Sequence, residues 1–327
     1  MNILITGGAG FIGQHLARAL LLRGTVNDLH GKPTAITRLR LFDMIKPSWG
    51  ADPRVQCIAG DIADAAAMRA VVGSDTHSIF HLAAVPSGGA EANFDLGLRV
   101  NLDGTRALLE ATRQLPAPPK FIFSSTAATF GGALPNPVPD DWPQSPQGSY
   151  GAQKAMAELL INDMSRRGMI DARIPRLPTI TVRPGAPNAA ASGFASGIVR
   201  EPVVGKEAII PVGPNAVMWI LSPAKVIEHL IALHDFTAGQ LAAAGLRHTR
   251  SLSLPGLSVS VGDMYEALCD VAGPEAGRLV KWQPDPAVER LVHSWPAAFE
   301  AKAGLALGLR GDASFDDIVR QHLATLT

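Results

Sequence analysis

A short apolar stretch followed at once by a glycine-rich run restricts this chain more than any other feature of its sequence. The stretch 3–5 (ILI) leads into the run 6–13 (TGGAGFIG), and apolar residues at helical spacing follow. In such a strand–turn–helix unit, glycines permit the tight turn, the approach of backbone to a pyrophosphate and close helix–strand packing. The positive helix N-terminus faces the phosphates. The run therefore predicts a dinucleotide site, and with it an enzyme; an ordinary glycine-rich turn is the alternative.

Composition favours a compact α/β protein without nucleic-acid or membrane partners. Hydrophobic residues make up 47% of the 327 residues, and Lys plus Arg equals Asp plus Glu at 29 each, so no basic field attracts nucleic acid. No apolar run approaches the ~20 residues that cross a bilayer. A strand at the chain start leaves no room for a signal peptide. Cys57 and Cys269 lack metal-ligand spacing, so we expect reduced thiols, no metal and a cytoplasmic location.

Strand and helix patterns alternate along the first 182 residues. After the first strand, we expect strands at 37–42, 55–58, 78–82, 120–124 and 176–182, with helices that include 98–112 and 150–165. Such alternation predicts an α/β fold with a Rossmann-type doubly wound parallel sheet, and ligands at the carboxyl ends of its strands.

Two acidic residues indicate which dinucleotide binds. Asp43 ends the second expected strand, where a carboxylate binds the ribose hydroxyls and repels a 2′-phosphate, which favours NAD over NADP. It follows the glycine turn later than the usual ~20 residues, and we attribute the delay to a loop at 24–34. Asp61 follows the third strand, within reach of the adenine amine. A helix cap or turn is the alternative for both.

The chain changes character near residue 180. Prolines, glycines and small residues become frequent between 182 and 214, and long excursions in compact proteins are usually functional. We expect residues 1–182 to form an NAD-binding domain to which elements of 217–272 return. Residues 183–216 and 273–327 are expected to form a smaller C-terminal substrate lobe, with a capped amphipathic helix at 314–326.

Tyr150 and Lys154 form the centre of a candidate catalytic group. They lie four residues apart in a predicted helix and hence on one face. An ammonium beside a phenol lowers the pKa of the phenol, so Tyr150 is a candidate general base. Ser124, Ser125 and Thr126 end the fifth strand at the same edge, where one hydroxyl can bind the reacting oxygen. A surface Tyr–Lys pair and a hydroxyl run that caps a strand are the alternatives.

Five motifs together resemble the extended short-chain dehydrogenase/reductases, the NAD-dependent epimerase/dehydratase family. They are the run 6–13, HLAA at 81–84, Asn101 ahead of Gly104 and Thr105, SST at 124–126, and YGAQK at 150–154. The resemblance implies Thr126, Tyr150 and Lys154 as the catalytic residues, with Ser125 as fallback for the hydroxyl, and a homodimer built on helices 150–165 and 98–112. The NAD contacts that it implies are Gly7, Gly10, Phe11, Ile12, Gly13, Asp43, Asp61, Ile62, Leu82, Ala83, Ala84, Asn101, Ser124, Tyr150, Lys154 and Pro178.

Motifs of the second half resemble one branch of that family, which oxidises the C2 hydroxyl of a small sugar acid with NAD. They include RLPT at 176–179, VRPG at 182–185, PNAAAS at 187–192, FASGIVREP at 194–202, MW at 218–219 and SWP at 294–296. Thr126 departs from this branch, in which serine is commoner. A substrate carboxylate needs a cation or donors, and the lobe offers Arg183, Asn188, Ser192 and Arg200. Ser125 is predicted as a further substrate contact.

Other functions use parts of the same pattern. A nucleotide-sugar epimerase is the first alternative, because it works with the same three catalytic residues. A dehydratase is disfavoured, since Ala127 and Ala128 follow Thr126 where an Asp-Glu pair is needed. A non-catalytic NAD sensor has no need of a base, so Tyr150 and Lys154 disfavour it.

Overall fold

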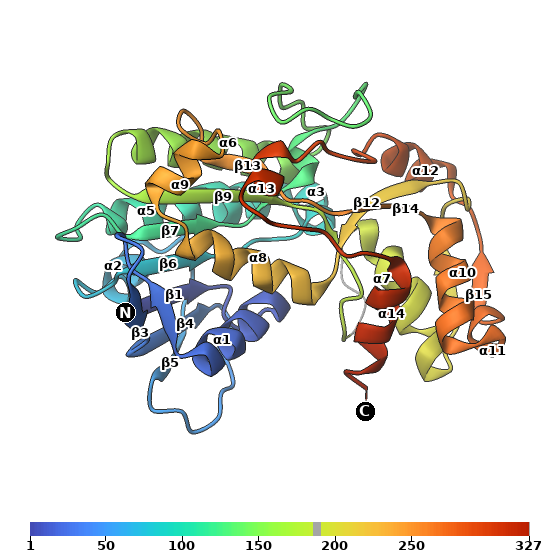
Figure 1. Cartoon of the computed structure of the whole chain (residues 1–327), viewed down its shortest axis with the longest axis horizontal. Coiled ribbons are helices and arrows are strands. Elements are labelled where there is room, and N and C mark those ends of the chain that lie inside the picture. Colours follow the sequence, from blue (N-terminus) through green and yellow to red (C-terminus); the bar gives the residue numbers. More distant parts are fainter. Residues whose placement is uncertain (186–190, 327) are drawn as a thin grey trace.

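The computed structural model describes residues 1–185 and 191–326. A parallel sheet of order β13-β9-β7-β6-β1-β4-β5, with β8 beside β9, forms its larger part (Figure 1). The strands are β1 (Asn2–Thr6), β4 (Arg38–Asp43), β5 (Val55–Ala59), β6 (Ser78–His81), β7 (Lys120–Phe123), β8 (Ser125–Thr126), β9 (Asp171–Leu177) and β13 (Ser251–Ser253). The strand order reverses between β1 and β6, as in doubly wound dinucleotide-binding sheets. The predicted Rossmann-type fold is confirmed.

Helices cover both faces of this sheet. One face carries α1 (Phe11–Arg23) and α8 (Pro223–Asp235), and the other carries α2 (Ala65–Val71), α5 (Gly104–Thr112) and α6 (Ser149–Arg166). Strand alternation decides which side chains meet which helices. Ile3 and Ile5 lie in the core with α1 and α8, whereas Leu4 between them lies in the core with the other three helices. The apolar run 3–5 is therefore buried on both faces.

The C-terminal half contains a second hydrophobic core, which lies beside the sheet in Figure 1. Its elements are α7 (Phe194–Arg200), α10 (Val261–Ala272), α14 (Phe315–Leu323), the sheet β10 (Thr179–Ile180), β12 (Val217–Leu221), β14 (Leu257–Ser260), and the pair β11 (Ala208–Ile210), β15 (Val280–Trp282). Ser314 caps α14 by accepting from the main-chain N–H of Asp317. We refer to these elements as the lobe.

Shorter elements complete the described structure. They are the strands β2 (Thr25–Asn27) and β3 (Pro33–Ala35), the helices α3 (Ser87–Ala92), α4 (Phe94–Gly97), α9 (Ala238–Ala243), α11 (Pro274–Gly277), α12 (Pro286–His293) and α13 (Lys302–Ala306), and the 3₁₀ turns Ala127–Thr129, Ala191–Gly193 and Pro202–Val204. Among the described helices, none has the length and apolar character needed to span a bilayer. The residues described also contain no cluster of side chains suited to a metal ion.

Two local expectations from the sequence are wrong in detail, and a third is refined. The loop expected at 24–34 is instead a hairpin of β2 and β3, because Val26 is buried in the core under α1 and α8. The strand expected at 176–182 begins five residues earlier as β9 and breaks at Pro178, which has no N–H to donate; β10 then joins the lobe sheet. The helix expected at 98–112 is confirmed, and its first part is the π-helical segment Leu98–Asp103 ahead of α5.

The segment 217–272 divides between the two parts. Helix α8 and strand β13 pack on or join the large sheet, whereas β12, β14 and α10 belong to the lobe. Beyond 273, Ala303 and Leu309 lie in the first core, so part of the C-terminal segment also packs on the larger part.

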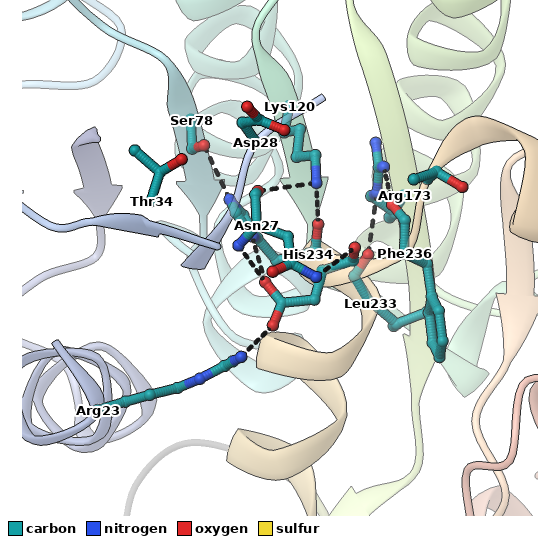
Figure 2. Close-up of polar contacts among 12 residues, drawn as sticks. Arg23, Asn27, Asp28, Thr34, Ser78, Lys120, Arg173, Leu233, His234 and Phe236 are labelled. Atoms are coloured by element: carbon teal, nitrogen blue, oxygen red, sulfur yellow. Dashed lines mark hydrogen bonds and ion pairs between the residues drawn. The ribbon is translucent and has the colours of Figure 1, made fainter. Parts of the chain in front are cut away.

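Buried cations tie the end of α8 to the amino ends of the strands (Figure 2). Lys120, which begins β7, donates to the main-chain carbonyl of His234 at 2.6 Å, and Arg173 of β9 donates to that of Leu233 at 3.0 Å. His234 contacts Ser78 Oγ through Nε2 at 2.8 Å. Cations near a helix C-terminus compensate its exposed carbonyl groups. The network thus fixes α8 at the sheet edge opposite to the one that carries the glycine turn.

Candidate active site

The glycine run forms a tight turn between β1 and α1. Gly7 has φ +73°, and a Cβ on it would lie 2.8 Å from the main-chain nitrogen of Ala83. A Cβ on Gly13 would lie 2.2 Å from the carbonyl oxygen of Gly7, and Gly10 N donates to that oxygen at 3.0 Å. Side chains are therefore excluded where α1 meets the turn, which leaves its N-terminus open to a phosphate.

The two candidate carboxylates for the cofactor lie at neighbouring strand ends. Asp43 ends β4 beside β1 and accepts a hydrogen bond from the main-chain N–H of Ala9 at 3.0 Å, so its carboxylate borders the glycine turn. Asp61 forms an ion pair with Arg99 and accepts from the main-chain N–H of Ala63 at 2.9 Å. The glycine turn with Asp43 at its side fits the adenosine end of NAD.

A chain of buried polar side chains links the ends of β1 and β6 to the π-helical segment. His81 contacts Thr6 Oγ1 through Nδ1 at 2.7 Å and Thr105 Oγ1 through Nε2 at 2.8 Å. Thr105 donates its hydroxyl proton to the carbonyl of Asn101, so it accepts from His81, and Nε2 carries the ring proton. Burial lowers the pKa of His81 to about 3, so the ring is neutral. The amide of Asn101 in turn binds both main-chain polar groups of Val85.

A cavity of about 540 Å³ opens at the carboxyl ends of the strands, bordered by the lobe. Ten of the residues predicted from the sequence line it: Ile12, Leu82, Ala84, Ser124, Ser125, Thr126, Tyr150, Pro178, Arg183 and Ser192. The structure therefore brings Thr126, Tyr150 and the predicted substrate contacts Ser125, Arg183 and Ser192 to one space, whereas Lys154 is not part of the lining. Phe11, Ile62 and Ala83 are not part of this lining.

Several lining residues were not predicted to have a role. Trp219 of β12 and Trp295 after α12 form aromatic walls, and Ser87, Glu91 and Gln147 add polar groups. The two tryptophans belong to the motifs at 218–219 and 294–296, which resemble the sugar-acid branch, so that resemblance could have indicated them. The three polar residues lie outside every motif.

Tyr150 and Lys154 project from α6 toward the ends of β7 and β8. The ammonium of Lys154 donates to the main-chain carbonyl of Ser124 at 3.0 Å and lies 5.8 Å from the centre of the Tyr150 ring. Burial lowers the pKa of Lys154 to about 7. Burial also raises the pKa of Tyr150 to about 12, and the opposing cation is Arg183. The expectation that Lys154 lowers the pKa of Tyr150 is thus wrong, because desolvation outweighs the effect of the Arg183 cation on the phenol.

The three hydroxyls at 124–126 have different partners. The Ser124 hydroxyl donates to the carbonyl of His81 at 3.2 Å, and the Ser125 hydroxyl donates to the buried carboxylate of Glu158. Thr126 Oγ1 only accepts, from the main-chain N–H of Ala128 at 3.1 Å, so its proton remains available to a ligand. The geometry favours Thr126 over the fallback Ser125 for the contact with a reacting oxygen.

The two arginines of the lobe that were predicted to bind the substrate differ in the position of their side chains. Arg183 is the cationic side chain among the described residues that line the cavity, and burial lowers its pKa. Arg200 is turned away: its Nε donates to Glu201 at 3.1 Å, and its Nη1 donates to the carbonyl of Arg183 at 3.0 Å. Ser192 lines the cavity, and Asn188 lies outside the described residues.

Sequence comparison gives the chain close relatives along its whole length. The model of the NAD dependent epimerase/dehydratase family matches residues 3–217. D-erythronate dehydrogenase of Cupriavidus necator is 51% identical over 99% of this chain and 98% of its own. The enzyme of the same name from Haemophilus influenzae is 40% identical over 99% of both chains.

A solved structure is similar at the same level. The crystal structure described as a nucleoside-diphosphate-sugar epimerase from Agrobacterium tumefaciens is 41% identical, with a TM-score of 0.90, and covers 99% of this chain and 94% of its own. This chain therefore shares both its large sheet and its lobe with an experimentally solved structure.

Proposed function

Because this chain belongs to the NAD-dependent epimerase/dehydratase family, we propose that it oxidises the C2 hydroxyl of a small sugar acid, most specifically D-erythronate to 2-oxotetronate. Membership makes NAD the cofactor, and the full-length relatives are dehydrogenases, so the protein is an NAD-dependent oxidoreductase. The substrate and the roles of single residues are the proposal.

The observation that carries this proposal is the shared position of Tyr150 and Arg183 on one cavity. Oxidation at C2 places a carboxylate next to the carbon whose hydroxyl meets the base. That carboxylate needs a cation close to Tyr150, and Arg183 is near enough to the phenol for each to shift the pKa of the other. A half-buried cation without a carboxylate partner among the described residues is suited to a substrate carboxylate.

In the proposed reaction, Tyr150 removes the proton of the C2 hydroxyl while Thr126 donates a hydrogen bond to the same oxygen. Arg183 holds the carboxylate, and Ser192 supplies a further donor. NAD, when bound, would supply the acceptor for the hydride that leaves C2. Trp219 and Trp295 exclude water from the reacting centre.

The test is NADH formation, followed by absorbance, with sugar acids of three to six carbons and with nucleotide sugars in parallel. We expect the highest kcat/KM for D-erythronate and no NADH from nucleotide sugars. A sugar acid of another length or configuration as best substrate would keep the reaction and correct the substrate. No activity on any sugar acid would overturn the proposal.

A nucleotide-sugar epimerase is the second candidate, supported by the description of the Agrobacterium structure. In an epimerase the hydride returns to the sugar, so no NADH accumulates and the product is an epimer of the substrate. Chromatography of nucleotide sugars after incubation with the enzyme detects that epimer. Its formation faster than any oxidation of a sugar acid would establish this candidate in place of the first.

A further inference from the structure

Glu158 is a buried carboxylate on α6 that lies one helical turn beyond Lys154 and two beyond Tyr150. The residue is only 1% exposed, and a charge so deep in a protein persists only where partners compensate its lost hydration. Arg176 of β9 provides a cation, with Nη2 at 2.8 Å from Oε2 and Nε at 3.1 Å from both oxygens. Gln144 donates to Oε2 at 3.0 Å, and Ser125 donates to Oε1.

Two of these partners, Ser125 and Arg176, connect Glu158 to the wall of the cavity. Ser125 stands between Ser124, whose carbonyl accepts from Lys154, and Thr126, whose hydroxyl faces the cavity. Arg176 lies over the ring of Phe130 at 4.9 Å, and Phe130 is part of the cavity wall. The carboxylate therefore holds the main chain that positions both the lysine and the threonine.

The charges around Lys154 also indicate a role for Glu158. Among the described residues, the titratable groups around Lys154 are Tyr150 and Glu158 on α6 and His81 on β6, and Arg176 of β9 pairs with Glu158. His81 is neutral, and Arg176 is engaged with Glu158. Among the described residues, Glu158 is the negative charge one helical turn from the lysine, and it raises the pKa of Lys154 against the lowering by burial.

We propose that Glu158 is a positioning residue of the reaction, which anchors the 124–126 main chain through Ser125 and provides the counter-charge that keeps Lys154 an ammonium. The inference rests on the proposed function only in taking Tyr150 as the base and Lys154 as its partner. The proposal adds Glu158 to Thr126, Tyr150 and Lys154 as a residue that supports the reaction but touches neither substrate nor cofactor.

The charge is tested by Glu158→Gln, which keeps the size of the side chain. The chain has eight lysines, so the ¹³Cε signal of Lys154 in lysine-labelled protein is assigned by its loss in Lys154→Met. In the cofactor-free enzyme, we expect Glu158→Gln to move the titration of Lys154 down by about one pH unit, as expected for removal of a nearby unit charge. The alkaline limb of the kcat profile should move in the same direction, because the proposed reaction needs Lys154 as an ammonium.

Two further variants separate charge from anchoring. Ser125→Ala keeps the carboxylate and removes its link to the main chain, so it should lower kcat without moving the Lys154 titration. Glu158→Asp keeps the charge on a shorter side chain and should restore the titration of Lys154 but not full kcat. An unmoved Lys154 titration in Glu158→Gln, or wild-type kcat in Ser125→Ala, would overturn the proposal. Because the titration needs no substrate, its outcome is independent of which sugar the enzyme oxidises.

Discussion

Arg200 donates through Nη1 to the main-chain carbonyl of Arg183 at 3.0 Å, so one arginine of the lobe supports the backbone of the other. Arg200 is also paired with Glu201, whereas the side chain of Arg183 faces the cavity. The two residues looked equivalent as carboxylate ligands in the sequence. The structure supports Arg183 for direct contact and Arg200 for holding it in place.

Arg183→Ala should raise KM for the sugar acid by about 30-fold or more, because loss of one partner of a buried charge pair costs ~2–5 kcal/mol. The dissociation constant of NAD should stay unchanged. Arg183→Lys serves as control and should recover part of the affinity, since a point charge replaces a two-pronged donor. Steady-state kinetics and NAD titration by fluorescence measure both quantities. A normal KM in Arg183→Ala would mean that main-chain donors or Ser192 bind the substrate carboxylate instead.

Tyr150→Phe should reduce kcat by ~10²–10⁴-fold, the usual contribution of a general base, and leave NAD binding nearly unchanged. Only the phenolic oxygen is lost, and the ring that lines the cavity remains. Turnover of the purified variant and its NAD affinity are the measurements. Near-normal turnover of Tyr150→Phe would show that Tyr150 is not the general base.

Asp43→Asn should weaken the preference for NAD over NADP, because a 2′-phosphate would no longer meet a carboxylate. The amide oxygen of asparagine can still accept from the N–H of Ala9, so the turn keeps its hydrogen bond. Asp43→Ala, which loses both charge and acceptor, is the comparison. The ratio of kcat/KM for the two cofactors is measured; a fixed ratio in both variants means that Asp43 only shapes the turn.

We propose that two copies of the chain associate through α6 and the adjacent helices. Leu159 and Met156 on α6 are 67% and 42% exposed, and Phe94 on α4 is 57% exposed. Leu159→Arg should therefore shift the protein to monomer in light scattering at micromolar concentration. Leu22→Arg is the control, since Leu22 is exposed on α1, away from this surface. A wild-type monomer under the same conditions would contradict the dimer.

Acid should weaken the fold through His234. Burial lowers the pKa of His234 to about 4, against its bond with Asp235, whereas the unfolded value is near 6.5. The unfolded chain therefore binds the proton first, so the stabilisation is complete above pH 6.5 and is lost as the pH falls toward 4. The loss is on the order of 3 kcal/mol.

Urea unfolding at pH 7.5 and 4.5 measures this effect. His234→Gln keeps a polar contact for Ser78 without a titrating group, and it should reduce the difference between the two pH values. His81 accounts for part of the remaining difference, since burial lowers its pKa to about 3. An equal difference in wild type and variant would show that His234 is not responsible.

The sequence by itself determined the features that depend on short-range spacing. The glycine turn, the alternating strands and the Tyr150–Lys154 pair each lie within a few residues of chain, where helix and strand periodicity decides which side chains share a face. The sixth strand was misplaced because the break at Pro178 depends on pairing: β9 pairs within the large sheet and β10 within the lobe.

Only the tertiary structure decided which polar groups compensate one another. Glu158 and Ser125 are 33 residues apart in the chain, and Arg183 shares a cavity with Tyr150 only because the lobe borders the strand ends. No periodicity links such pairs, since burial determines them: a carboxylate or guanidinium removed from water must find a partner among whatever residues surround it. The same desolvation raised the pKa of Tyr150, where the spacing from Lys154 alone predicted the opposite.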